Sequence, residues 1–172
     1  MRKIFVTGIG TDVGKTIVSA VITEALQADY WKPVQAGYAD GTDTELVRNL
    51  VTNKKTVIYP EAYKLNMPAS PHAAAAAEGI EIRIKDIITP NTSNDLVIEG
   101  AGGLMVPLNE KELVIDLIEY LQASVVVVIR HYLGSINHSL LTLQALKQRN
   151  IPIFGLVISG TPNEQSEKAI LS

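Results

Sequence analysis

The sequence contains no cysteine, which excludes a disulfide framework and any thiolate metal site. Aromatic residues are also scarce: they make up 5% of the 172 residues, while hydrophobic residues make up 47%. The core must therefore be built from valine, isoleucine, leucine and alanine, which suits buried parallel strands covered by helices. The length fits one domain, residues 1–172, and is too short to favour two.

A basic surplus and long hydrophobic runs are missing as well. The formal net charge is −3 and the lysines and arginines are scattered, so no general nucleic-acid footprint is expected. The longest strongly apolar run, 125–129, is far too short to span a membrane. Only three apolar residues follow Met1-Arg2-Lys3 before Thr7, too few for a signal peptide. We therefore expect a soluble, cytoplasmic protein with neither a nucleic-acid nor a membrane partner.

Short apolar runs alternate with stretches of helical periodicity along the chain. We expect strands over 3–7, 30–34, 95–99, 125–129 and 153–158, and helices over 15–27, 43–51, 70–88, 113–121 and 136–149. The apolar stripe of the first helix is expected to comprise Ile17, Val18, Val21, Ile22, Ala25 and Leu26. Residues 35–42 are expected to form a loop, 56–71 to be irregular, and glycines in 100–103 to end regular structure. The alternation predicts right-handed βαβ units and a three-layer α/β/α fold with a mainly parallel central sheet.

Residues 8–16, Gly-Ile-Gly-Thr-Asp-Val-Gly-Lys-Thr, join the first expected strand to the first expected helix. Such a joint presents backbone N–H groups and a helix N-terminus to phosphate. Lys15 would add a positive charge at the β- and γ-phosphates, and the Thr16 hydroxyl could ligate Mg²⁺. The spacing is a variant, because Ile9 occupies the usual first glycine position and Gly8 lies one residue earlier. The alternative is a glycine-rich turn with an unrelated lysine, but the flanking strand and helix favour a P-loop NTPase-like fold.

Two acidic residues lie near the carboxyl ends of expected strands, where ligands of open parallel sheets bind. Asp43 and Glu99 could join Thr16 around Mg²⁺, a hard ion that prefers oxygen ligands. The sequence alone leaves two alternatives open: Asp43 as a helix N-cap, and Glu99 as a solvated charge at a strand end.

Lys32 interrupts an apolar strand, which is unfavourable for an ammonium group unless it meets an anion. The alternative is a lysine that reaches water at a sheet edge. Residues 134–137 open a helix whose free N–H groups could hold a carboxylate, unless Ser135 is an ordinary cap. His72 and His138 are expected to make structural hydrogen bonds rather than to catalyse.

Five motifs occur in the order that one family shows. They are Thr-Asp-Val-Gly-Lys-Thr at 11–16, Lys-Pro-Val at 32–34, Ser-Pro-His at 70–72, Glu-Gly-Ala-Gly-Gly-Leu at 99–104 and Leu-Gly-Ser-Ile-Asn-His at 133–138. Together they resemble the dethiobiotin synthetase family from residue 2 to about residue 160. The resemblance implies ATP- and Mg²⁺-dependent carboxylation and ring closure of 7,8-diaminononanoate with CO₂, which gives dethiobiotin, ADP and phosphate in biotin biosynthesis. One amine takes up CO₂ as a carbamate, the carbamate attacks the γ-phosphate, and the second amine displaces phosphate.

The resemblance also implies a role for each motif residue. Lys15, Lys32 and Thr11 would be catalytic and converge on the carbamate. The nucleotide would be bound by Asp12, Val13, Gly14, Lys15, Thr16, Glu99, Gly102 and Ser159. Mg²⁺ would be held by Thr16, Asp43 and Glu99. The substrate would be bound by Lys32, Ala36 and Pro71, and by Gly134, Ser135, Ile136 and Asn137 of the neighbouring subunit in a homodimer.

Three features depart from the family pattern. Gln35 and Ala36 precede Gly37 where the family often has a small hydroxyl residue. Ser159 stands where the family commonly has an asparagine that reads the base. The sequence stops at Ser172, several dozen residues before family members usually end, so we expect the usual C-terminal extension to be lacking.

The alternative function is a P-loop ATPase switch that acts on a protein or membrane partner. Related partitioning ATPases carry an additional lysine near the start of the phosphate loop, where this chain has Gly8, Ile9 and Gly10. They often carry a basic amphipathic tail, and none is expected before Ser172. An inert regulatory domain that only binds nucleotide is disfavoured, because the metal and substrate residues are all retained.

Overall fold

The computed structural model describes residues 1–39 and 41–172. In chain order the elements are β1 (Lys3–Gly8), α1 (Lys15–Leu26), β2 (Asp29–Trp31), β3 (Val34–Ala36), α2 (Asp43–Leu50), β4 (Ile58–Tyr59), β5 (Tyr63–Leu65), α3 (Pro71–Ala77), a 3₁₀ turn η1 (Ile84–Asp86), β6 (Leu96–Gly103), α4 (Val114–Leu121), β7 (Ser124–Arg130), α5 (Ser135–Gln148), β8 (Ile153–Ser159) and α6 (Glu164–Leu171). Six strands form a parallel sheet in the order β4-β2-β6-β1-β7-β8, and β3 pairs in parallel with β5.

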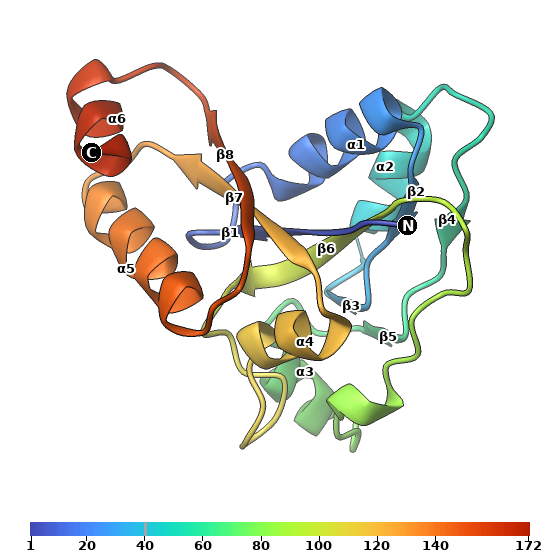
Figure 1. Ribbon diagram of the computed structural model, residues 1–172. Coiled ribbons are helices and arrows are strands. Elements are labelled where there is room, and N and C mark those ends of the chain that lie inside the picture. The colour runs from blue at the N-terminus through green and yellow to red at the C-terminus, as the bar shows by residue number, and fades with distance from the viewer. Residues whose placement is uncertain (40) are drawn as a thin grey trace.

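Helices cover both faces of the main sheet (Figure 1). Side chains alternate along each strand, so Ile4 and Val6 of β1 pack in the apolar layer of α1 and α2, whereas Phe5 packs in the layer of α3, α4 and α5. The predicted three-layer α/β/α fold with a mainly parallel sheet is confirmed. Because β1 pairs with both β6 and β7, the loop that follows it lies at the middle of the sheet's carboxyl edge.

The predicted apolar stripe of α1 is only partly correct: Val18 is buried and Ile22 packs against the core, but other members of the stripe are exposed. Ile17 and Val21 are 51% and 62% exposed, whereas the buried residues are Lys15, Val18, Ser19, Ala20 and Thr23. The buried face of the helix is therefore rotated relative to the predicted stripe. The phosphate loop accounts for this rotation, because it turns Lys15 inward at the first residue of the helix. The small side chains at 19 and 20 then let the helix approach the sheet closely.

The predicted strand 30–34 is broken at Lys32-Pro33. β2 ends at Trp31 within the main sheet, and β3 begins at Val34 in the small one. Pro33 has no N–H to continue the ladder, and its carbonyl instead accepts hydrogen bonds from the backbone N–H groups of Ala62 and Tyr63, both at 2.9 Å. The regions expected to be loops therefore contain the end of β3 and the short strands β4 and β5, and Lys32 lies where the chain changes sheets.

Three further predictions differ from the structure. Helix α3 ends at Ala77, and only the 3₁₀ turn η1 forms within 83–88, because Gly79 adopts a left-handed φ of +68°. Strand β6 continues through Gly103, since Gly100 packs where an added Cβ would lie 2.6 Å from Cε1 of Phe5. Helix α6 was not anticipated from the sequence; the Asn163 side chain caps it by accepting from the N–H of Ser166 at 3.0 Å.

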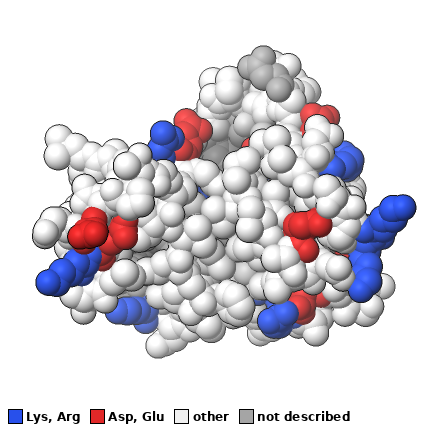
Figure 2. Space-filling model, turned by 90° about the horizontal axis from the view of Figure 1, so that it is seen from above, with Lys and Arg blue, Asp and Glu red and all other residues white. Residues whose placement is uncertain are grey.

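The other predicted strands and helices agree with the structure to within one or two residues at each end. Acidic and basic side chains lie around the margin of the face seen in Figure 2, and its centre is largely uncharged. Within 1–39 and 41–172, no helix is both long and apolar enough to cross a membrane.

Candidate active site

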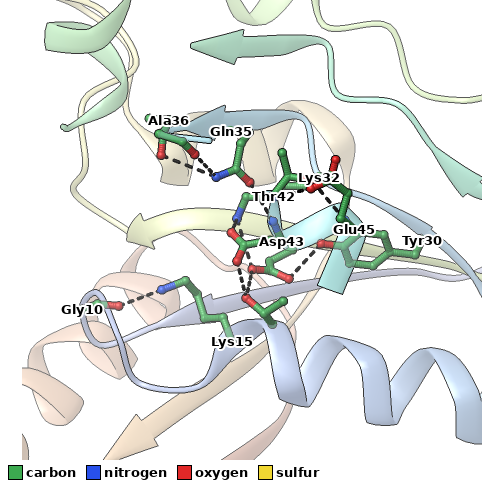
Figure 3. Close-up of polar contacts among 12 residues, drawn as sticks. Gly10, Lys15, Tyr30, Lys32, Gln35, Ala36, Thr42, Asp43 and Glu45 are labelled. Atoms are coloured by element: carbon green, nitrogen blue, oxygen red, sulfur yellow. Dashed lines mark hydrogen bonds and ion pairs between the residues drawn. The ribbon is translucent and has the colours of Figure 1, made fainter. Parts of the chain in front are cut away.

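The phosphate loop joins β1 to α1 through two residues in the left-handed region, Asp12 at φ +56° and Gly14 at φ +99°. Gly8 explains the variant spacing: a Cβ there would lie 2.5 Å from Cγ2 of Val13, so the end of β1 needs a glycine where the loop folds over it. An added Cβ at Gly10 would meet nothing within 4 Å. Lys15 curls back over the loop and donates from Nζ to the Gly10 carbonyl at 2.9 Å (Figure 3).

Thr16, the second residue of α1, faces two carboxylates. Its Oγ1 lies 2.8 Å from Oδ1 of Asp43 and 2.9 Å from Oε1 of Glu99, so the hydroxyl can donate to either. These three groups come from α1, α2 and β6, and they meet at the carboxyl edge of the sheet. Glu99 is buried, so the alternative of a solvated strand-end charge is wrong.

The alternative role of Asp43 as a helix cap is wrong too. Thr42 is the N-cap of α2: its Oγ1 accepts from the N–H of Glu45 at 3.0 Å, and Oε2 of Glu45 accepts from the N–H of Thr42 at 2.9 Å. This capping box satisfies the first turn of the helix. The Asp43 side chain therefore contacts Thr16 and Lys32 instead.

Lys32 is buried rather than exposed at an edge, so its alternative is also wrong. Nζ lies 2.6 Å from Oδ2 of Asp43 and 3.1 Å from Oε1 of Glu99. Burial lowers the pKa of Lys32, but the charges of Glu99 and Asp43 outweigh burial and raise that pKa above its ordinary value. Burial likewise raises the pKa of Asp43, and the charge of Lys32 outweighs it and lowers that pKa. The ion pair therefore stays charged.

The positive charge of Lys32 also affects the pKa of Lys15, the second lysine of the site. Burial lowers the pKa of Lys15, and the positive charge of Lys32 lowers it further. Two lysines from different elements thus border one region, as the motifs predicted.

Tyr30 and Gln35 belong to the site although the sequence did not identify them. The Tyr30 phenol donates to Oε2 of Glu99 at 2.9 Å. Oε1 of Gln35 accepts from the N–H of Asp43 at 3.2 Å, and its Nε2 donates to the Gly37 carbonyl at 2.7 Å. Strand periodicity offered a signal for Tyr30, because residues two apart share a face and Lys32 is two residues on. Nothing in the sequence pointed to the amide of Gln35.

The two lysines, Gln35 and the oxygen donors Thr16, Asp43 and Glu99 border a pocket of about 720 Å³, which Tyr30 does not line. The predicted site residues that line it are Thr11, Asp12, Gly14, Lys15, Thr16, Lys32, Ala36, Asp43, Pro71, Glu99 and Gly102. The other lining residues are Ile17, Val34, Gln35, Leu46, Pro68, Ala69, Ser70, Ala101 and Val106. Charged groups therefore stand beside an extended apolar wall.

Two predicted nucleotide-binding residues, Val13 and Ser159, do not line the pocket. The Val13 side chain is buried, and its carbonyl accepts a hydrogen bond from Oγ of Ser159 at 2.7 Å. Ser159 ends β8, so this bond ties the loop to the neighbouring part of the sheet.

Four predicted substrate residues, Gly134–Asn137, also do not line the pocket. They form the start of α5, where Gly134 is the N-cap and no side chain caps the helix, so the alternative of a Ser135 cap is wrong. His138 makes the expected structural hydrogen bond, with Nδ1 2.7 Å from the hydroxyl of Tyr132. A second groove of about 650 Å³ runs between the phosphate loop, the residues after β6 and helix α5.

An oxygen-only set of donors suits Mg²⁺, and Thr16, Asp43 and Glu99 provide one. No group of three or more histidine, aspartate and glutamate side chains gathers as a metal site in the part of the chain that the structure describes. A Mg²⁺ ion held by the two carboxylates and the hydroxyl would take its remaining ligands from phosphate and water, as is usual for this ion.

Solved structures share the fold. A ParA family ATPase from Chlorobium tepidum TLS superposes with a TM-score of 0.57 at 16% identity, over 98% of this chain and 80% of that one. A putative plasmid partition protein from Borrelia burgdorferi B31, bound to AMPPNP, gives a TM-score of 0.57 at 15% identity, over 99% and 80%. At this identity the likeness concerns the fold alone.

Sequence relatives are much more similar. The family described as "AAA domain" matches residues 2–172. The ATP-dependent dethiobiotin synthetase of Christiangramia forsetii is 55% identical over 98% of this chain and 81% of its own length. The enzymes of the same name from Cytophaga hutchinsonii and Paramagnetospirillum magneticum are 55% and 48% identical over 99% of this chain. The chain therefore belongs to the family of ATP-dependent dethiobiotin synthetases.

Proposed function

We propose that this protein carboxylates 7,8-diaminononanoate with CO₂ and closes the ring to dethiobiotin, with ATP converted to ADP and phosphate. One observation carries the proposal: Lys15 and Lys32, from separate elements, border the same pocket as the oxygen donors Thr16, Asp43 and Glu99. That arrangement provides for a transferred phosphoryl group and a second small anion side by side.

The residues of the chain would act by position and charge. One amine of the substrate reacts with CO₂ and loses a proton, and Lys15, Lys32 and the Thr11 hydroxyl hold the resulting carbamate. A carbamate oxygen attacks the γ-phosphorus while ADP departs. The second amine then attacks the carbamoyl carbon, and phosphate leaves as the C–N bond of the cyclic urea forms. Holding the reacting groups together lowers the entropic part of the barrier.

Mg²⁺, held by Thr16, Asp43 and Glu99, would supply positive charge to the phosphates when bound. Asp12, Gly14 and Gly102 line the pocket beside them and would border the nucleotide. Val13 and Ser159 would act by fixing the loop through their mutual hydrogen bond. This role of Ser159 differs from reading the base.

The apolar wall fits the rest of the substrate. Ile17, Leu46 and Pro71 are among the apolar residues that line the pocket, and Ile17 and Leu46 are 51% and 42% exposed. A chain of methylene groups laid along them would shield both surfaces from water, which is favourable. Ala36, at the end of β3, keeps this side of the pocket apolar.

We propose that the carboxylate at the far end of the substrate is held by Gly134–Asn137 of a second copy in a homodimer. Support comes from the start of α5, where no side chain caps the helix, and from the fact that none of these four residues lines the pocket of its own chain. The adjoining groove and the exposed side chains of Met105, Leu133 and Leu141 suit an apolar interface. The proposal also places the enzyme in the cytoplasm, which the absence of cysteine fits.

A mixing experiment tests the shared site. Lys32→Gln and Asn137→Asp are each expected to be inactive alone. Refolding them together should restore about a quarter of the wild-type activity, because half of the dimers are hybrid and each hybrid holds one intact site. No recovery, in mixtures shown to form hybrid dimers, would contradict the shared site.

The reaction itself is tested with purified protein, 7,8-diaminononanoate, bicarbonate, Mg²⁺ and ATP. We expect one phosphate released for each dethiobiotin formed, and almost no phosphate without the diamine. Phosphate release that needs no diamine and that a protein or membrane partner stimulates would instead support an ATPase switch.

A further inference from the structure

The two carboxylates proposed to hold Mg²⁺, Asp43 and Glu99, are neutralised in this structure by the ammonium group of Lys32. Lys32 pairs with Asp43 at 2.6 Å and with Glu99 at 3.1 Å, while Thr16 bonds the same two carboxylates at 2.8 and 2.9 Å. Oε1 of Glu99 is contacted by both the hydroxyl and the ammonium group. Figure 3 shows Lys32 and Asp43 at the centre of this cluster.

A divalent cation and this ammonium group compete for the same oxygens. Mg²⁺ binds carboxylate oxygens at about 2.0–2.1 Å, so an ion on Asp43 and Glu99 would stand within a few ångströms of Nζ of Lys32 as it now lies. Two cations that close in a buried setting repel each other strongly. The carboxylates can therefore satisfy the ammonium group or the metal, but not both at full strength.

The ammonium group of Lys32 has a second position available to it. Its side chain borders the 720 Å³ pocket, which it shares with Lys15, Val34 and Ala36. Rotation of its four-carbon stem would carry Nζ from the carboxylates toward this space without unfolding either strand. An ammonium group left there needs a new anion, because burial without one is costly.

We propose that Lys32 is an internal counter-ion of the metal site, which a divalent cation displaces from Asp43 and Glu99 into the pocket. Metal binding would thereby release the positive charge that receives the substrate anion. Loading the metal would strengthen anion binding, and by linkage the anion would strengthen metal binding. The displacement stands on the geometry alone, whereas the identity of the anion as a carbamate rests on the proposed function.

The first test removes the competing cation. Lys32→Met keeps most of the side-chain volume without a charge, and Lys85→Met is the control, since it removes an exposed lysine. Binding of Mn²⁺ alone, measured by electron paramagnetic resonance of the free ion, is expected to be about tenfold tighter in Lys32→Met than in wild type, because a unit charge at close range is removed. Lys85→Met should match wild type. Equal or weaker Mn²⁺ binding in Lys32→Met, or no binding by either protein, would overturn the proposal.

The second test uses wild-type protein, so it does not depend on the folding of a variant. Brief acetylation with an amine-reactive reagent, followed by mass spectrometry, measures how accessible each lysine is. Added Mg²⁺ should raise labelling of Lys32 at least about threefold, since a lysine side chain that has moved into the pocket is more accessible to the reagent than one buried in its ion pairs, and leave Lys85 unchanged. Labelling of Lys32 that does not change with Mg²⁺ would contradict displacement. Neither readout requires dethiobiotin, so a failed synthetase assay with positive results here would refute the proposed function and leave the counter-ion role standing.

Discussion

The phenol of Tyr30 donates a hydrogen bond to Oε2 of Glu99 at 2.9 Å, and both residues are buried. Burial raises the pKa of Tyr30 well above its ordinary value, and the charge of Glu99 raises it further, so the phenol remains a donor. With Oε2 occupied in this way, Oε1 is the oxygen turned toward Thr16 and Lys32. Tyr30 therefore positions the carboxylate without lining the pocket.

Tyr30→Phe should weaken both the fold and the metal site. The variant leaves a buried carboxylate oxygen without its donor, which is expected to cost about 1–3 kcal/mol in the free energy of unfolding, measured with urea. Loss of such a supporting contact is expected to weaken Mn²⁺ binding about 10- to 100-fold. Tyr59→Phe is the control, because it removes a 3.3 Å contact with Asp29 and leaves Glu99 untouched. If both variants lose Mn²⁺ affinity equally, the positioning role of Tyr30 is wrong.

Lys32→Gln should separate nucleotide binding from turnover. The amide has no positive charge for a second anion, so dethiobiotin formation should fall at least about 100-fold. ATP affinity, measured by calorimetry, should stay within about threefold, because the phosphate loop is unchanged. Lys85→Gln, at an exposed position, should behave as wild type. Normal turnover in Lys32→Gln would remove this lysine from the mechanism.

Substitution by alanine at Gly8 and at Gly10, the first two glycines of the phosphate loop, should change stability by different amounts. Gly8→Ala places a methyl group 2.5 Å from Cγ2 of Val13 and 2.8 Å from the Gly10 carbonyl, and we expect it to lose about 1–3 kcal/mol of stability. Gly10→Ala meets nothing within 4 Å and should stay within about 0.5 kcal/mol of wild type. Urea unfolding of both variants gives the comparison. Equal losses would mean that the close approach at Gly8 does not determine the variant spacing.

The hydrogen bonds of Glu24 predict how the stability of the fold changes at low pH. Its carboxylate accepts four hydrogen bonds from the backbone and side chains of Thr52 and Asn53, which lower its pKa from 4.5 to about 2. A lowered pKa stabilises the fold fully above pH about 4.5, and this contribution disappears as the pH falls toward 2. Glu24→Gln should therefore be less stable than wild type at neutral pH, and the difference should shrink between pH about 4.5 and 2. Urea unfolding across this range measures it, with Glu81→Gln as the exposed control.

Local sequence patterns were enough to predict the layers of the fold and the charged residues of the pocket. The strand around Val125–Ile129 and helix α4 follow from short-range periodicity. The motif residues at strand ends met in one pocket because parallel strands bring their carboxyl ends to one edge.

Features that depend on distant contacts were not predictable from the sequence. The rotation of α1 is fixed by the inward turn of Lys15, which overrides the apolar stripe that includes Ile17 and Val21. β6 runs on through Gly103 because distant Phe5 and Gly8 pack against it. Helix α6 buries only Ile170, so its apolar pattern is faint, although Asn163 was a readable cap.

The place of β1 in the sheet has a consequence for synthesis of the protein. Both neighbours of this strand come much later in the chain: Ile4 pairs with Val97 on one side and with Ser124 on the other. A nascent chain that has left the ribosome only as far as residue 90 therefore contains every residue of the phosphate loop but neither of the two strands that flank β1. Pairings this remote form slowly, and the nucleotide site is accordingly assembled late, only after β7 has been made.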